Sequence, residues 1–264
     1  MNSSRRLFSI ALVMFVVAAV PAFASHSWGG YHWARTANPF TLKVANNTNN
    51  GWPTYFDTAA SDWTSSTIMH LSTSIGTSSR KCSMVAGTVQ VCNNTYGSNG
   101  WLGLASINIS GLHITQGSAK MNDTYFNTST YNNPNEKLHV MCQEVGHTFG
   151  LDHQDTSGAS LNTCMDYYSN TGANATDPAS THPNAHDYDE LVTIYTHLDS
   201  TTTLAASAIF PNAVSAVDGN DRSSWGRLVS SEGRSAIYEL DFGGGNKTIT
   251  FVTWADDSHG NSGN

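Results

Sequence analysis

Apolar and polar positions divide the first half of the chain into alternating strands and one helix. Apolar residues alternate with polar ones over 40–44, which predicts a strand, and a turn-forming cluster follows at 46–51. From Trp52 to Trp63 apolar residues recur at helical spacing, and Pro53 suits the first turn of a helix. A short apolar run follows at 68–71, and the apolar segments 101–109 and 112–121 predict two strands separated by Gly111. This half is therefore mixed α/β.

The second half contains two helical patterns separated by a long polar segment. One apolar stripe predicts a helix from Asn135 or Glu136 to Gly150, because glycine favours helix termination there. A second predicts a helix over 185–198. The segment 152–183 between them is irregular, and in a compact domain such a segment is pinned or functional. A C-terminal hairpin is predicted by the alternating segments 236–242 and 247–254, which flank a glycine-rich turn.

Composition narrows the class of partner. The 264 residues suffice for one sizeable buried core. Charged residues are only 12% of the chain, against about a quarter in an average soluble protein, and apolar residues reach 39%, which excludes a charge-rich disordered chain. A net charge of −8 disfavours nucleic acid and anionic lipid as partners. We expect a neutral or basic macromolecule as partner, no nucleic acid, and a monomer.

The N-terminal residues have the pattern of an export signal. Arg5 and Arg6 precede an apolar run over 10–20 and a small-residue cleavage pattern at Ala22 and Ala24. The run is shorter than the ~20 residues that a membrane helix needs, so a transmembrane anchor is disfavoured. We expect a secreted protein without a membrane span. Its expected parts are a signal peptide (1–24), a main domain (25–199), and a linker with a small β-rich extension (200–264).

Export changes how the four cysteines are interpreted. Cys82, Cys92, Cys142 and Cys164 form an even set in a compartment that permits disulfides, with three possible pairings. Cys82 and Cys92 bracket a short segment that ends in an apparent returning strand, so their pairing would close a local hairpin. That leaves Cys142 with Cys164. A cysteine zinc site is the alternative, but no pair has the short spacing of a zinc ribbon.

The stretch 143–153 carries the chemistry. Gln143 and His147 are one helical turn apart on one face, as two ligands of one metal must be. Glu144 lies beside that face, where a general base could reach the attacking water without ligating the metal. Gly150 can end the helix in a left-handed conformation, so that His153 meets the same metal. The spacing predicts three ligands and one base.

This stretch resembles the zinc-binding signature of the metzincin metalloproteases, His-Glu-x-x-His-x-x-Gly-x-x-His, except that Gln143 replaces the first histidine. The resemblance implies Zn²⁺ as the cofactor; Ca²⁺ is an open second metal without assigned ligands. It also implies a turn that places a methionine beneath the metal, for which Met165 is the candidate. Tyr167, two residues later, is then an additional ligand or an oxyanion stabiliser, and we include it with Glu144 as catalytic.

The resemblance extends to the order of elements over 31–198, which is matrixin-like. It implies an α/β (α+β) catalytic domain with a twisted mixed sheet, an active-site helix, a Met-turn and a C-terminal helix, followed here by the small hairpin tail. In this family an edge strand binds substrate as an added strand, and 112–121 is the expected candidate. Pairing of Cys142 with Cys164 would tie the active-site helix to the Met-turn.

Gln143 leaves two functions open. Its neutral oxygen is a weaker zinc ligand than imidazole, so the site either works with a more electrophilic metal or has lost the metal. We expect a secreted zinc endopeptidase in which a metal-activated water attacks the peptide bond and Glu144 is the general base. The alternative is a pseudo-protease that binds an exported peptide or protein. His139 is too far along the helix to ligate and is expected at the solvated surface or behind the ligands. A third hypothesis gives the tail from about Thr201 onward a separate role in surface attachment or substrate recruitment.

Overall fold

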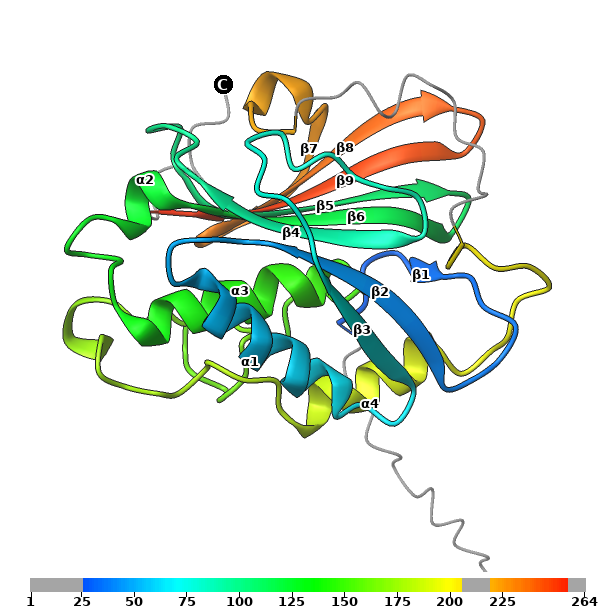
Figure 1. The fold of residues 1–264 in the computed structure, drawn as a ribbon, viewed down its shortest axis with the longest axis horizontal. Helices are drawn as coiled ribbons and strands as arrows, with labels where there is room; N and C mark the ends of the chain where they lie inside the picture. Colours follow the sequence, from blue (N-terminus) through cyan, green and yellow to red (C-terminus); the bar gives the residue numbers. More distant parts are fainter. Residues whose placement is uncertain (1–25, 206–218, 256–264) are drawn as a thin grey trace, which may run out of the picture.

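A mixed sheet of nine strands forms the centre of the molecule. The computed structural model describes residues 26–205 and 219–255, so the expected signal peptide at 1–24 lies outside the described residues. The strands are β1 (His32–Trp33), β2 (Phe40–Asn47), β3 (Met69–Ile75), β4 (Thr88–Asn94), β5 (Trp101–Ser110), β6 (His113–Asn122), β7 (Arg227–Glu232), β8 (Ser235–Gly243) and β9 (Asn246–Trp254). Helices α1, α3 and α4 lie together on one side of this sheet (Figure 1).

The sheet order is β3-β2-β4-β6-β5-β9-β8-β7, and β1 adds to β6. Neighbouring strands from β3 to β6 run parallel, whereas β5, β9, β8 and β7 continue antiparallel. The mixed α+β class expected from the sequence is confirmed. The expectation that 112–121 is an edge strand is wrong, because β6 lies between β4 and β5 and also pairs with β1. The C-terminal strands extend this same sheet.

The helices follow the predicted patterns, but α3 and α4 end earlier than predicted. Helix α1 (Trp52–Thr64) buries the apolar residues that predicted it and carries a proline in its first turn. Helix α3 (Pro134–His147) is capped by the Asn133 side chain and ends three residues before Gly150. Helix α4 (Ala185–Ile194) begins with a capping box and stops before 198. The shorter elements are α2 (Asp123–Phe126), η1 (Gly172–Asn174) and η3 (Arg222–Ser224).

Two apolar cores lie on the two faces of the sheet. The larger one joins the sheet to the helices. Alternation along β9 directs Phe251 to that core, and Val252 and Trp254 to a second core formed with β5, β8 and Trp225. The predicted hairpin at 236–254 is confirmed as β8 and β9. Strand β7 was not predicted, because its side chains are intermediate or exposed and show no buried alternation.

Both expected disulfides are present, Cys82–Cys92 and Cys142–Cys164. The second ties helix α3 to the segment that contains Met165. The local hairpin expected around Cys82 is wrong: β3 and β4 pair parallel with opposite sides of β2, and Cys82 lies in the connection between them. Disulfides of this kind are consistent with an oxidising, extracellular environment. Within the described residues, no helix is long and apolar enough to cross a bilayer.

Candidate active site

Helix α3 carries three of the expected site residues into the interior. Gln143, Glu144 and His147 are all buried, with 2%, 0% and 0% of their surfaces exposed. The helix can approach the rest of the core because Gly146 has no side chain: a Cβ there would lie 2.7 Å from Met165 Sδ and 2.7 Å from the Trp63 ring. Met165 therefore lies directly against the helix.

A reversal of the chain brings His153 back to His147. Gly150 has a φ of 92°, which favours glycine, and a Cβ at this residue would lie 2.0 Å from the Tyr31 carbonyl oxygen. His147 Nδ1 lies 2.9 Å from the Leu151 carbonyl oxygen, which fixes the proton on Nδ1 and leaves a lone pair on Nε2. The His147 and His153 rings are 4.6 Å apart between centroids. The two imidazoles therefore lie next to each other, as the spacing of His147 and His153 in the sequence predicted.

The segment after Cys164 lies against His153 and is held in place by hydrogen bonds of Met165. The Met165 amide donates to Thr163 Oγ1, and the Met165 carbonyl accepts from the Gln154 amide, so the turn is bound on both sides. The Tyr167 ring lies 4.3 Å from the His153 ring between centroids. Burial raises the Tyr167 pKa, which keeps the phenol protonated. Tyr167 can therefore donate a hydrogen bond beside the two imidazoles.

Glu144 is a buried carboxyl group held at one oxygen. Its Oε1 accepts a hydrogen bond of 2.7 Å from Thr253 Oγ1, and a Cβ on Gly103 would lie 2.3 Å from the same oxygen. Burial raises the pKa of Glu144 to about 8, although hydrogen bonds from Thr253 and the Ala105 backbone oppose this. In this arrangement Glu144 is mostly protonated at neutral pH.

Gln143 is fixed by a network of hydrogen bonds. Its Nε2 donates to the carbonyl oxygens of Cys164, at 3.0 Å, and Asp166, at 2.8 Å, and its Oε1, 2.9 Å from Thr253 Oγ1, shares the single hydroxyl proton of Thr253 with Glu144. One lone pair of Oε1 is left for a metal. His139 Nε2 lies 3.3 Å from Gln143 Nε2, and His139 is buried, so the expectation of a solvated surface position is wrong.

Strand β9 covers the site, which the sequence did not reveal. Thr253 bonds both Gln143 and Glu144, and the Phe251 ring stacks on His147 at 4.4 Å with an interplanar angle of 3°. The remaining cavity, bordered by Gln143, His153 and Tyr167, measures about 10 Å³, which is no more than one water requires. Alternation over 247–254 places Phe251 and Thr253 on one face, but nothing in the sequence says which strand β9 joins on the side away from β8.

The residues fit a zinc ion. His147 Nε2, His153 Nε2 and Glu144 Oε2 are buried and have no hydrogen-bond partner among the described residues. Buried polar atoms without partners are costly, and two imidazole nitrogens are the donors that zinc favours. Gln143 Oε1 can complete three protein ligands, as in catalytic zinc sites that keep one position open.

Comparison with known proteins assigns no family: no protein-family model matches the chain, and no curated protein matches it. The functional assignment therefore rests on the site's own residues.

Proposed function

We propose that this protein is a secreted zinc-dependent endopeptidase whose C-terminal strands hold it in a closed form. The observation that supports this best is the pair of adjacent buried imidazoles, His147 and His153, whose Nε2 atoms have no hydrogen-bond partner among the described residues, together with the unpartnered Oε2 of the buried Glu144. A structural role alone would leave three buried polar atoms uncompensated. The resemblance of 143–165 to the metzincin signature points to the same chemistry.

Each residue has a role in peptide hydrolysis. His147, His153 and Gln143 Oε1 would hold the zinc, which supplies Lewis-acid activation of water and of the scissile carbonyl. Glu144 accepts a proton from the attacking water and returns it to the leaving amine. Tyr167, protonated and beside His153, donates to the oxygen on which negative charge develops.

Strand β9 explains why the site is closed. Strand β5 lies next to helix α3, and the resemblance implies that a strand at the edge of the sheet binds extended substrate. Here β9 pairs with β5 from Trp101 to Ser110 and occupies that edge. Substrate can bind only after β9 is displaced, and displacement also exposes Glu144 to water, which favours its carboxylate form.

Casein cleavage by the purified protein tests the proposal, with and without a zinc chelator. Glu144→Gln keeps the acceptor for Thr253 but removes the base, so we expect at least a hundredfold lower rate, in the range of lost general-base catalysis. Thr253→Val removes the bonds from β9 to Gln143 and Glu144, so we expect faster cleavage than in wild type. Thr250→Val is the matched control, because Thr250 faces Ser106 away from the site.

Two outcomes would contradict the proposal. Cleavage by Glu144→Gln at the wild-type rate assigns the activity to a contaminant or to another site. If every variant is inert, including Thr253→Val with zinc added, the metalloprotease assignment fails.

The alternative is a pseudo-protease that binds a peptide or protein partner. The specific observation in its favour is Gln143, whose amide already satisfies three partners and leaves only one lone pair for zinc. Gln143→His in the Thr253→Val background separates the two functions. Activity that appears only with this histidine shows that Gln143 silences the site, whereas activity already present with Gln143 supports the enzyme.

A further inference from the structure

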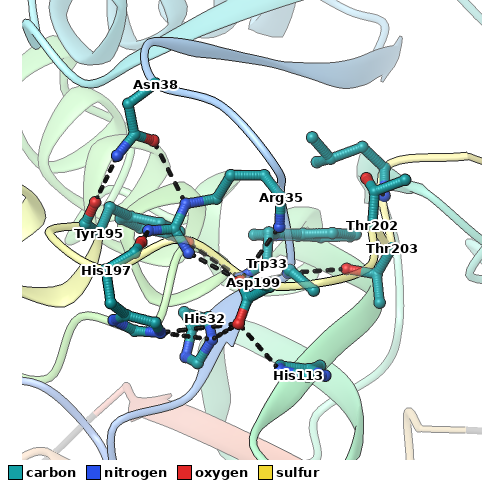
Figure 2. A network of polar contacts seen from close by, with 12 residues as sticks. His32, Trp33, Arg35, Asn38, His113, Tyr195, His197, Asp199, Thr202 and Thr203 are labelled. Atoms are coloured by element: carbon teal, nitrogen blue, oxygen red, sulfur yellow. Dashed lines mark hydrogen bonds and ion pairs between the residues drawn. The ribbon is translucent and has the colours of Figure 1, made fainter.

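Three histidines and one aspartate converge at a second place, where the N-terminal strand meets the segment after helix α4. His32 and His113 are register partners on the parallel strands β1 and β6. His197 and Asp199 follow the end of α4, and their side chains point at the same spot (Figure 2). None of these residues belongs to the candidate active site, and no motif in the sequence connects them.

The distances within this cluster have the size of a zinc coordination shell. Asp199 Oδ1 lies 3.3 Å from His32 Nε2, 3.2 Å from His113 Nε2 and 3.7 Å from His197 Nε2. His197 Nε2 and His32 Nε2 are 3.1 Å apart. Tetrahedral zinc with bonds of 2.0–2.1 Å separates its ligand atoms by about 3.3 Å. His32, His197 and Asp199 form the tight group, within 4.8 Å of one another, and His113 approaches the shared carboxylate oxygen.

The neighbours of the cluster orient its lone pairs inward. His32 Nδ1 lies 2.8 Å from the Gly30 carbonyl oxygen, so the proton is on Nδ1 and the Nε2 lone pair faces Asp199 and His197. Arg35 is buried and binds the other carboxylate oxygen through its backbone amide, at 3.1 Å, and Nη1, at 2.9 Å. Asp199 Oδ1 is therefore left for the centre of the cluster.

A positive charge at the centre would satisfy all of these groups. Imidazole lone pairs and a carboxylate oxygen repel one another at such distances unless a cation or shared protons lie between them. Imidazole nitrogen suits Zn²⁺ and its transition-metal neighbours, whereas Mg²⁺ and Ca²⁺ prefer oxygen ligands. The half-exposed His113 and His197 give an ion access from solvent, while His32 is buried.

We propose that His32, His197 and Asp199 bind a structural zinc ion, with His113 as the fourth ligand. The ion would join β1, β6 and the segment after α4. Two of these elements, β1 and the segment after α4, also contact the chain reversal before His153: Trp33 Nε1 donates to the Thr148 carbonyl oxygen, and the Tyr195 hydroxyl donates to the Phe149 carbonyl oxygen. The inference does not depend on the proposed protease activity.

Zinc content and thermal unfolding test the site in the full protein. In His147→Ala/His153→Ala, which removes the ligands of the active site, we expect one tightly bound zinc per chain and a higher Tm with zinc than with chelator. His197→Ala in that background should lose both properties. In the otherwise wild-type chain, His197→Ala should bind one zinc fewer, which decides the matter if the double variant does not fold.

His182→Ala is the matched control, because His182 is 54% exposed against 53% for His197 and also pairs with one carboxylate, Asp62, outside any cluster. It should keep the zinc. Cobalt gives a second readout: Co²⁺ at the site should show the visible absorption of tetrahedral coordination, and His113→Ala should change it. If zinc content and Tm are the same in His197→Ala and His182→Ala, the cluster binds only protons and the proposal is overturned.

Discussion

At the scale of single residues, glycines position the site as much as the proposed ligands do, because they leave room for neighbouring groups. Gly103 and Gly146 leave the room that Glu144 and Met165 occupy. Gly150 combines a left-handed backbone with a close approach to the Tyr31 carbonyl oxygen, so it fixes where the chain turns toward His153. A sequence pattern shows that glycine is present at these places, but the atom that excludes a Cβ comes from far along the chain.

Gly150→Ala tests this positioning. The added Cβ would meet the Tyr31 oxygen at 2.0 Å in a backbone conformation that alanine disfavours, so we expect a loss of about 2–4 kcal/mol in the free energy of unfolding. Gly30→Ala is the control, because Gly30 has a φ of 70° and open space around it, and should lose only about 1 kcal/mol. Urea unfolding measures both. Equal losses would show that the contact with Tyr31 is unimportant.

The buried carboxyl group predicts a pH dependence. The raised pKa of Glu144, about 8 through burial, means that the folded metal-free protein binds more protons than the unfolded chain above pH 4.5, so stability falls as pH rises toward 8. Burial lowers the pKa of His147 to about 3. Between pH 3 and 6.5 this group therefore makes the folded protein more stable as pH rises, and above pH 6.5 it has no further effect. Between pH 6.5 and 8 the contribution of His147 has therefore ended, while that of Glu144 continues.

We expect metal-free wild type to lose about 2 kcal/mol of unfolding free energy from pH 6.5 to 8 relative to Glu144→Gln. Denaturant unfolding in chelator at several pH values measures the difference. Parallel curves for the two proteins would show that Glu144 is not buried as described.

At the scale of elements, the connection between helix α3 and the Met165 turn is covalent as well as hydrogen-bonded. The Cys142–Cys164 disulfide closes a loop with a separation of 22 residues, and Gln143 Nε2 binds two carbonyl oxygens of the same turn. The Cys82–Cys92 disulfide closes a loop with a separation of 10 residues, away from helix α3. The two crosslinks therefore differ in what they hold.

Replacing each pair with alanine separates these roles. Loop entropy alone gives about 3 kcal/mol for either disulfide, so we expect similar losses in the free energy of unfolding. Only Cys142→Ala/Cys164→Ala should also weaken zinc binding at His147 and His153, because it frees the turn beneath them. Calorimetric zinc titration in the His197→Ala background measures this. Equal zinc affinity in both double variants would show that the Cys142–Cys164 disulfide does not support zinc binding at His147 and His153.

At the scale of the whole molecule, local patterns predicted elements, and distant contacts decided their partners. Helix α3, the His147–His153 spacing and both cysteine pairings could be predicted, because each depends on residues close in sequence or on elimination. The edge position assigned to 112–121 was wrong, since sheet order depends on long-range pairing. The hydrogen bond between Thr253 and Glu144 and the contact between His32 and Asp199 each join residues more than 100 positions apart. Periodicity contains no information about such pairs.

The pairing of β9 with β5 also sets an order of events in biosynthesis. Ribosomes make β5, helix α3 and His153 well before β9, so a nascent chain has the parts of its site before it has the strand that covers them. Until β9 arrives, β5 is an unpaired strand edge open to other chains. Docking of β9 on β5 is thus the step that covers the His147 ring.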